Sequence, residues 1–494
     1  MNNKLFRIFA AHMAETLKEK TAKGLFWGGL NNGTTQVLNA VIGIFLGRLL
    51  SPAEYGIVGV LTIFTAVAGA IQASGFTQGL INLKKPTDKD YNTVFWFNIS
   101  VSLVLYTILF VSAPLIASHF HQPCLVEVSR VVFLCLPISA LGITSNAYML
   151  KNMMNRELAI INFIALCLSG FTGIMLALHD FSYWSLVCQQ LLYITLTNIG
   201  RYYYMRWMPS LKVDFTPVKK MYGFCVKLMI TNIINTLNQH YLTFIFGGLF
   251  PIKAVGNYSQ ANKWNTMASS TISGTIGQVA QPVLVSINDE KDREIRVFRK
   301  LLRFTAFLSF PAMFGLALVS REFILLTIGD QWLNCIPMLQ ILCLAGAFLP
   351  FYSLYQNLTI TAGKSNIYMW CNISQILIQL AIIATLYHQG IIVLISVYSA
   401  FTVLWLLVWQ MVAQKLIGIK FFDAMKDIIP FMVISLAVMV ATYYLTSAIT
   451  NHILLLFSRI IIAALLYFII MRLTGAKVFE ECIKFVQEYS DRHS

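Results

Sequence analysis

Hydrophobic residues in this chain gather in long runs that short polar gaps separate. Fourteen runs are about long enough to cross a membrane as a helix, which needs about 20 mostly apolar residues. They span residues 24–47, 55–81, 93–117, 125–150, 156–178, 181–205, 222–249, 254–287, 298–319, 334–361, 366–387, 390–413, 428–448 and 453–472. The pattern therefore predicts an all-α, polytopic membrane protein with about 14 transmembrane helices.

Positive charges alternate between the two sets of polar gaps. Of the 36 Lys and Arg residues, 30 fall in the amino-terminal arm, the gaps after every second run and the carboxyl tail, or within six residues of these segments. The remaining six are Arg48, Arg130, Lys253, Lys263, Arg321 and Arg459. Because cytoplasmic loops collect Lys and Arg, we expect an even number of helices, both termini in the cytoplasm and location in the inner membrane.

Composition narrows the class of protein further. The chain is 57% hydrophobic with a mean hydropathy of +0.69, which exceeds what soluble domains carry. Its net charge of +15 follows from the positive-inside rule and anionic lipid headgroups, so no nucleic-acid partner is expected. No gap is long enough to fold as a soluble domain, which argues against most enzymes.

Nine cysteines are scattered singly, without a CxxC pair or a Cys/His cluster. This pattern predicts no metal site and no other cofactor. Cys124 and Cys335 fall in outer gaps, and whether they form a disulfide stays open.

An internal repeat indicates two related lobes. Residues 45–56 join the first and second runs, residues 245–256 join the seventh and eighth, and an offset of 200 sets Gly47 on Gly247 and Gly56 on Gly256. Transporters with such repeats commonly bind substrate at the repeat interface. We expect an amphipathic cytoplasmic segment (1–23), an N-lobe of six helices (24–205), a cytoplasmic linker (206–221), a C-lobe of six helices (222–413), two further helices (414–475) and a cytoplasmic tail (476–494).

These motifs carry a family resemblance. The resemblance depends on five segments of the chain. They are residues 24–27 with Gln36, Gly47-Arg-Leu-Leu-Ser-Pro-Ala-Glu-Tyr-Gly56, and residues 74–76, 256–263 and 362–364. Over essentially its whole length the chain resembles the Wzx or WzxC-like polysaccharide flippases. That branch shares a superfamily with multidrug extruders and the lipid II flippase.

The resemblance implies a transporter that makes and breaks no bond. Its cargo would be an undecaprenyl-diphosphate-linked oligosaccharide, a repeat unit of O-antigen, capsule or exopolysaccharide, moved from the cytoplasmic to the periplasmic leaflet by alternating access. Implied partners are this glycan lipid, membrane lipids, and the glycan polymerase and export machinery. The last two helices line a groove for the lipid tail in related lipid flippases.

Lys263 is the leading candidate for contact with an anionic cargo. It lies about ten residues, roughly 15 Å, into the eighth run. A lysine at that depth is costly unless it faces a cavity or a counter-charge. Lys227, near the inner end of the seventh run, is a second candidate for the diphosphate, with snorkelling to the interface as the alternative.

Amide side chains on three helices are the candidates for contact with sugar hydroxyls. They are Asn32 and Gln36 in the first run, Asn235 in the seventh, and Asn257 and Gln260 in the eighth. The alternative role for such residues is hydrogen bonding between helices.

Three further residues have two open roles each. Arg48 and Glu54 flank the first outer turn and form either a gate or a static ion pair. His240 in the seventh run either carries a coupling proton or is a core histidine.

Acidic residues separate the competing functions. All 21 Asp and Glu fall in gaps, tails or helix ends, so no carboxylate is predicted at mid-membrane depth. A multidrug or cation antiporter of the same superfamily is therefore less favoured, because it would use buried carboxylates. That antiporter, a peptidoglycan lipid II flippase and a non-transporting scaffold remain the alternatives.

Overall fold

The computed structural model describes residues 27–73, 80, 86–205, 207–210, 216–286, 291–476 and 479–480. Within these residues the regular elements are helices, and none is a strand. The predicted all-α fold class is thereby confirmed. The predicted segment 1–23 lies outside the described residues, as does most of the predicted tail.

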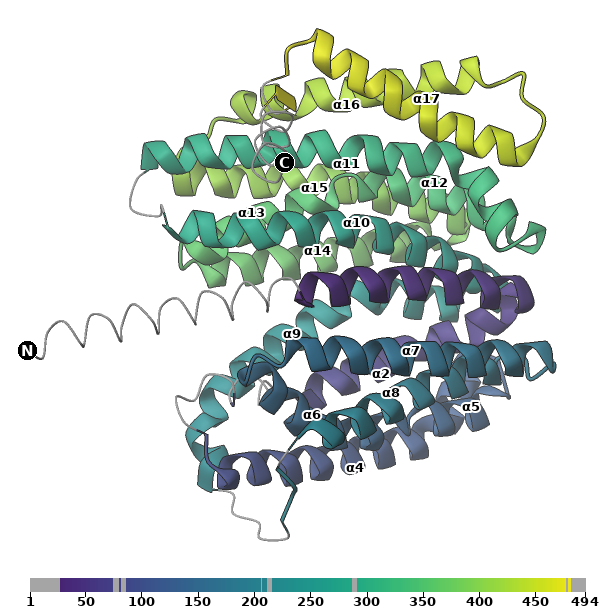
Figure 1. The fold of residues 1–494 in the computed structure, drawn as a ribbon, viewed down its shortest axis with the longest axis vertical. Coiled ribbons are helices and arrows are strands. Elements are labelled where there is room, and N and C mark those ends of the chain that lie inside the picture. The colour runs from purple at the N-terminus through teal and green to yellow at the C-terminus, as the bar shows by residue number, and fades with distance from the viewer. Residues whose placement is uncertain are drawn as a thin grey trace, which may run out of the picture. The chain divides into compact units, whose positions relative to one another are not determined.

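The chain divides into two compact units, Met1–Val255 and Gly256–Ser494. In the first unit, α7 packs along α8, α2 along α9, and α4 along α6 (Figure 1). Its described elements are a helix over residues 27–49, α2 (Pro52–Ala73), α4 (Asp88–His119), α5 (Leu125–Val132), α6 (Cys135–Lys151), α7 (Asn155–Leu178), α8 (Trp184–Tyr204) and α9 (Thr216–Leu249).

The second unit is organised around α11, which packs against α12, α16 and α17. The helix α10 (Ile252–Ser286) begins in the first unit and continues in the second. The other elements are α11 (Lys291–Thr327), η1 (Asp330–Trp332), α12 (Cys335–Gly346), α13 (Leu349–Thr361), α14 (Ser365–Leu386), η2 (Tyr387–Gln389), α15 (Ile391–Ile417), α16 (Phe421–Leu445) and α17 (His452–Leu473).

Most of these helices are suited to cross a membrane. Among the described residues, ten helical segments are long and apolar enough to do so. The helix at 27–49 and α8, α9 and α10 lie where four more spans were predicted but are not among the ten. They carry many amide, hydroxyl and charged side chains, so the count of 14 stays a prediction.

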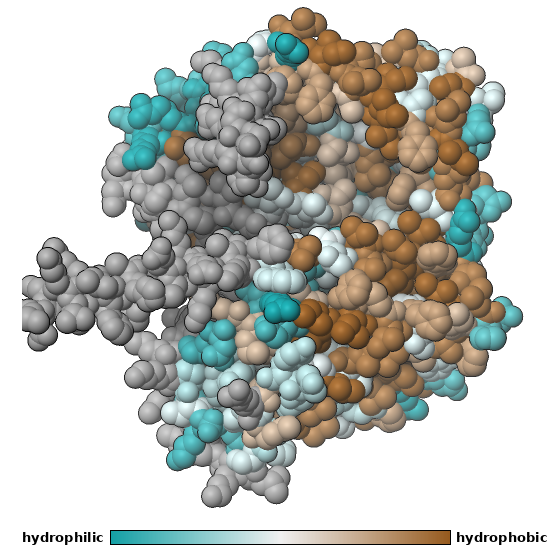
Figure 2. Space-filling view, viewed as in Figure 1, coloured by the Kyte–Doolittle hydropathy of each residue, from teal (hydrophilic) through white to brown (hydrophobic). Residues whose placement is uncertain are grey.

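Apolar side chains face outwards along the helices of both units. On α17 alone, Leu454, Phe457, Ile461 and Leu465 are each more than half exposed. Figure 2 shows such apolar side chains over broad areas of the visible surface, with hydrophilic ones gathered towards the helix ends. This distribution suits helices whose solvent is lipid.

Two of the predicted spans are broken into two helices. The fourth run forms α5 and α6, and the tenth forms α12 and α13. Pro137 and Pro350 lie in the first turn of the second piece in each case, where proline removes no hydrogen bond of the helix. The break therefore occurs in equivalent helices of the two predicted lobes.

The outer-loop cysteines are both free thiols. Cys124 lies in the first unit, directly before α5, and Cys335 is buried at the start of α12 in the second.

Candidate functional site

Lys263 lies on α10, eleven residues from the start of that helix. Its side chain is half-buried, and its Nζ lies 5.6 Å from the centroid of the Trp264 ring. Within the described part of the chain, the ammonium group has no hydrogen-bond or ion-pair partner. The distance to the ring is within the range of a cation–π contact, which compensates only part of the cost of placing a charge there.

The amides of α10 divide between two faces of the helix. Asn257 and Gln260 belong to its buried face and are 2% and 0% exposed, while Lys263 lies on the adjoining, less buried face. Both amide atoms of Gln260 lack a hydrogen-bond partner within the described residues. Leaving a buried amide without hydrogen bonds costs free energy. Gln260 can therefore still donate and accept hydrogen bonds inside the second unit.

The helix at residues 27–49 presents its two candidate amides on one side. Asn32 is exposed and Gln36, four residues later, is half-buried, so the two side chains lie one turn apart on one face. The neighbouring Asn31 accepts a hydrogen bond of 3.2 Å from Asn162 on α7. Amides on this helix therefore include at least one that links helices rather than faces outwards.

Glu54 closes a capping box at the start of α2. Its carboxylate accepts hydrogen bonds from the Ser51 backbone N–H at 2.6 Å and from the Ser51 hydroxyl at 2.7 Å, and Pro52 occupies the first helical position. This is the sequence signature of a helix start. Arg48 is exposed at the end of the preceding helix, and a gate made with Glu54 stays a prediction.

The candidates on α9 differ in how they are placed. Asn235 and His240 are half-buried along the helix, and the side chain of Lys227 lies outside the described residues. Further along α9, Phe244 packs edge-on against Phe64 of α2 and Phe120. The carboxyl-terminal half of α9 is thus fixed within the first unit.

The structure groups these candidates by unit. Asn32, Gln36, Arg48, Glu54, Asn235 and His240 belong to the first unit, and Asn257, Gln260 and Lys263 to the second. Their common role in binding stays a prediction.

Sequence reasoning missed three buried carboxylates among the described residues. Glu294 is 4% exposed in the first turn of α11, and the other two pair with arginines across helices. Glu322 is 3% exposed on α11 and pairs with Arg459 of α17 at 2.7 Å. Asp427 of α16 is 4% exposed and pairs with Arg299 of α11 at 2.6 Å. Both acids lie near helix ends as predicted, but they are inside the protein. Arg459, an isolated charge within the last apolar run, could have indicated a buried carboxylate partner on another helix.

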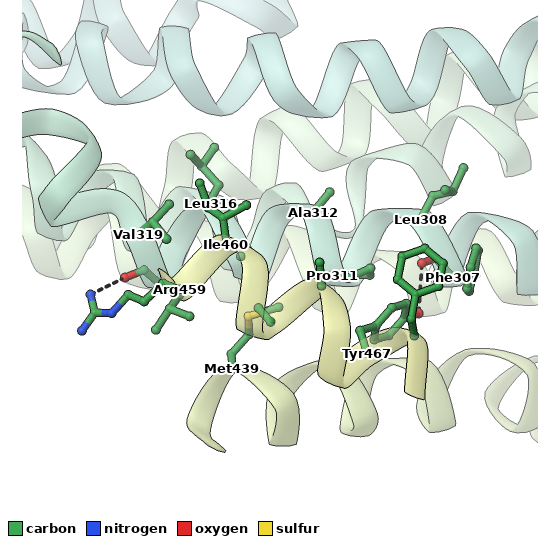
Figure 3. Close-up of a pocket in the computed structure, with 15 residues that line it drawn as sticks. Phe307, Leu308, Pro311, Ala312, Leu316, Val319, Met439, Arg459, Ile460 and Tyr467 are labelled. Carbon is green, nitrogen blue, oxygen red and sulfur yellow. Dashed lines mark hydrogen bonds between the residues drawn. The ribbon is translucent and has the colours of Figure 1, made fainter. Parts of the chain in front are cut away.

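An apolar pocket of about 470 Å³ lies between α11, α16 and α17. Figure 3 shows Pro311, Leu316 and Ile460 along its wall, with Arg459 at one end. Towards the other end, the Tyr467 hydroxyl donates to the Phe307 carbonyl at 3.0 Å. Its shape and lining suit a hydrocarbon chain.

The chain matches a known protein family over more than half of its length. A profile described as "Polysaccharide biosynthesis protein" matches residues 45–337. The chain is 25% identical to the lipopolysaccharide biosynthesis protein WzxC of Escherichia coli, over 67% of this chain and 68% of WzxC. It is 24% identical to the succinoglycan biosynthesis transport protein ExoT of Rhizobium meliloti, over 72% of this chain and 73% of ExoT.

Among solved structures, the fold is similar to that of the lipid II flippase MurJ. The TM-score is 0.74 at 14% sequence identity, over 91% of this chain and 99% of MurJ. At that identity the similarity concerns the fold alone.

Proposed function

Since the chain belongs to the polysaccharide biosynthesis protein family, we propose that it is a flippase for an undecaprenyl-diphosphate-linked oligosaccharide. The glycan lipid moves from the cytoplasmic to the periplasmic leaflet by alternating access, and no bond is made or broken. The names of its relatives, one in lipopolysaccharide biosynthesis and one in transport for succinoglycan biosynthesis, support this class of cargo. The protein resides in the inner membrane with both termini in the cytoplasm.

The observation that carries the proposal is the unpaired ammonium group of Lys263. A cation inside a membrane protein without a counter-charge is poorly compensated in the unliganded state. An anionic cargo supplies the missing charge, and a diphosphate supplies several acceptor oxygens. In this proposal Lys263 binds the diphosphate inside the membrane, and Lys227 meets it on loading.

Sugar hydroxyls require partners that both donate and accept, which amides provide. We assign Asn32, Gln36 and Asn235 to this role because their side chains are at least partly exposed. Asn257 and Gln260 are assigned to the same role in the second unit, where Gln260 retains unused hydrogen-bonding capacity. Arg48 and Glu54 close the outer end, and His240 carries the coupling proton.

The polyprenyl tail must stay in an apolar environment while the headgroup crosses. We assign the pocket between α11, α16 and α17 to that tail. Fourteen of the 15 lining residues are uncharged, so the pocket matches a hydrocarbon better than a sugar.

A multidrug or cation antiporter is the second candidate. It would use a buried carboxylate that can exchange a cation. Among the buried carboxylates of the described residues, Glu322 and Asp427 are neutralised by arginine side chains. Glu294 lies in the first turn of α11, at the end of the helix. The two ion pairs and the position of Glu294 at a helix end therefore favour the flippase.

The test is leaflet-resolved detection of undecaprenyl-diphosphate oligosaccharide in cells depleted of the protein. We expect wild type to clear glycan lipid that accumulates on the cytoplasmic leaflet, and Lys263→Ala and Lys263→Glu to fail. Lys263→Arg should retain part of the activity. Lys253→Ala is the matched control, because Lys253 is exposed at the start of the same helix. Normal surface polysaccharide from Lys263→Glu would refute the role of Lys263.

A further inference from the structure

Arg201 lies on α8, which runs beside α6 in a fixed register. The Asn198 amide donates to the Ile138 carbonyl at 2.6 Å, and the Tyr202 hydroxyl donates to the Leu141 carbonyl at 2.7 Å. The two bonds flank Arg201 along α8. They place it beside the middle of α6, close to Gly142.

The guanidinium of Arg201 lies beside Gly142 of α6. A Cβ atom added to Gly142 would lie 3.1 Å from the Arg201 Nη1 and would collide with the Asn198 amide. Helical side chains lean towards the amino-terminal end of their helix. The Arg201 side chain is therefore expected to lean away from the carboxyl-terminal end of α8. Glycine at position 142 leaves room first for the Asn198 amide, and the Arg201 guanidinium lies next to it.

The depth of this level follows from the length of the span. Residues 125–151 form a span of 27 residues, roughly 40 Å long, against about 30 Å of hydrocarbon. Gly142 precedes Lys151 by nine residues, roughly 14 Å of helix. With about 5 Å of the span outside the hydrocarbon at each end, the guanidinium lies roughly 9 Å inside it.

No partner compensates this charge. Within the described residues, Arg201 has no hydrogen bond or ion pair, and its Nε is covered without a partner. Other arginines of the protein differ in this respect, since Arg130 stacks on the Phe110 ring at 4.4 Å and Arg459 pairs with Glu322. The residue is still partly exposed, so an anion can reach it.

We propose that Arg201 is an anion-binding residue of the first unit that binds the diphosphate of the polyprenyl-linked cargo. The proposal rests on the proposed function. A guanidinium presents two parallel N–H donors to phosphate oxygens, which an ammonium does not. Gly142 and Asn198 position it: the first leaves the space, and the second is held by its bond to Ile138.

The experiment measures ligand-dependent stabilisation of the purified protein in nanodiscs of a zwitterionic lipid. The probes are a short polyprenyl diphosphate, the matching polyprenol, and phosphatidylglycerol. The variants are Arg201→Met and Arg201→Lys, with Arg130→Met as the matched control in the same unit. A ligand that binds only the folded state raises the unfolding temperature in proportion to its binding.

For Arg201→Met we expect an unfolding temperature without ligand equal to or above that of wild type, because an unpaired charge is removed. Affinity for the polyprenyl diphosphate should fall at least tenfold, and affinity for the polyprenol should not change. Arg201→Lys should recover part of the loss. Arg130→Met should bind the diphosphate like wild type.

Each other outcome has a defined meaning. If Arg201→Met lowers the unfolding temperature without ligand and binds the diphosphate normally, Arg201 is structural and the inference is wrong. If phosphatidylglycerol binding falls as much as diphosphate binding, the site takes a phospholipid phosphate and the assignment to cargo is overturned. If wild type itself does not bind the polyprenyl diphosphate, the proposed function fails instead.

Discussion

Arg459 and Glu322 form an ion pair that joins α17 to α11, with 2.7 Å between Nη1 and the carboxylate oxygen. Arg459 also donates to the Leu318 carbonyl and the Thr446 hydroxyl, both at 3.3 Å. Because both charges are buried, their attraction mainly offsets the cost of removing them from water. The pair therefore contributes more to the position of α17 on α11 than to net stability.

Breaking the pair from one side should be costly. We expect Arg459→Met to lower the free energy of unfolding by about 3–5 kcal/mol, because Glu322 would remain buried without a partner. The double variant Arg459→Met with Glu322→Leu should recover most of that loss, since neither charge remains. Denaturant unfolding in detergent measures both. A double variant as unstable as the single one would contradict this account.

A second charged contact joins α16 to α11. Asp427 accepts from Arg299 Nε at 2.6 Å and from Arg303 Nη1 at 3.4 Å. We expect Asp427→Asn to cost about 2 kcal/mol, because three part-buried charge-assisted hydrogen bonds, two from Arg299 and one from Arg303, weaken together.

Asp423 provides the matched control for Asp427. It lies on the same helix, 4.0 Å from Arg299, with a side chain that is 39% exposed. Asp423→Asn should change stability by less than about 0.5 kcal/mol. Equal losses in the two variants, measured as unfolding free energies in detergent, would show that burial of the pair does not matter.

Hydropathy predicted the helices well, because membrane helices are set by local composition. The fifth run was predicted at 156–178, and α7 covers Asn155–Leu178. The break in the fourth run was missed, since Leu125 to Lys151 is continuously apolar apart from a few polar residues. Pro137 was its only local signal, and a proline in a membrane helix is compatible with a continuous span.

Charges paired across helices could not be predicted in the same way. Glu322 and Arg459 are 137 residues apart, and nothing local indicates that their helices meet. The depth of Arg201 was missed for a related reason. It lies near the end of the sixth run, where a snorkelling arginine is the ordinary expectation. The contacts between α6 and α8 that bring it beside Gly142 are between helices far apart in the sequence.

The start of α2 meets the start of α10 at Gly56. A Cβ at this position would collide with the carbonyl oxygen of Ile252, at the start of α10. We therefore expect Gly56→Ala to push these two helix starts apart and lower the unfolding free energy by about 1–3 kcal/mol. Unfolding in detergent would measure it.

Gly69→Ala is the control for Gly56→Ala because it lies on the same helix and a Cβ there meets nothing within 4 Å. Alanine favours a helix over glycine by about 1 kcal/mol, so this variant should be neutral or stabilised. If Gly56→Ala and Gly69→Ala had the same unfolding free energy, the contact with Ile252 would not require glycine at position 56.

The pocket between α11, α16 and α17 can be tested by filling it. Ala312 lines the pocket, and Ala312→Phe would occupy part of its volume of about 470 Å³. If the polyprenyl tail binds there, the variant should fold, bind the diphosphate probe less tightly and export surface polysaccharide at a reduced rate. Val433→Phe is the control, because Val433 is exposed on α16 and does not line the pocket. Phenylalanine adds apolar surface in both variants, but only in Ala312→Phe does the ring enter the pocket. Only that variant should therefore impair export. Unchanged export and unchanged diphosphate binding in Ala312→Phe would place the tail outside this pocket.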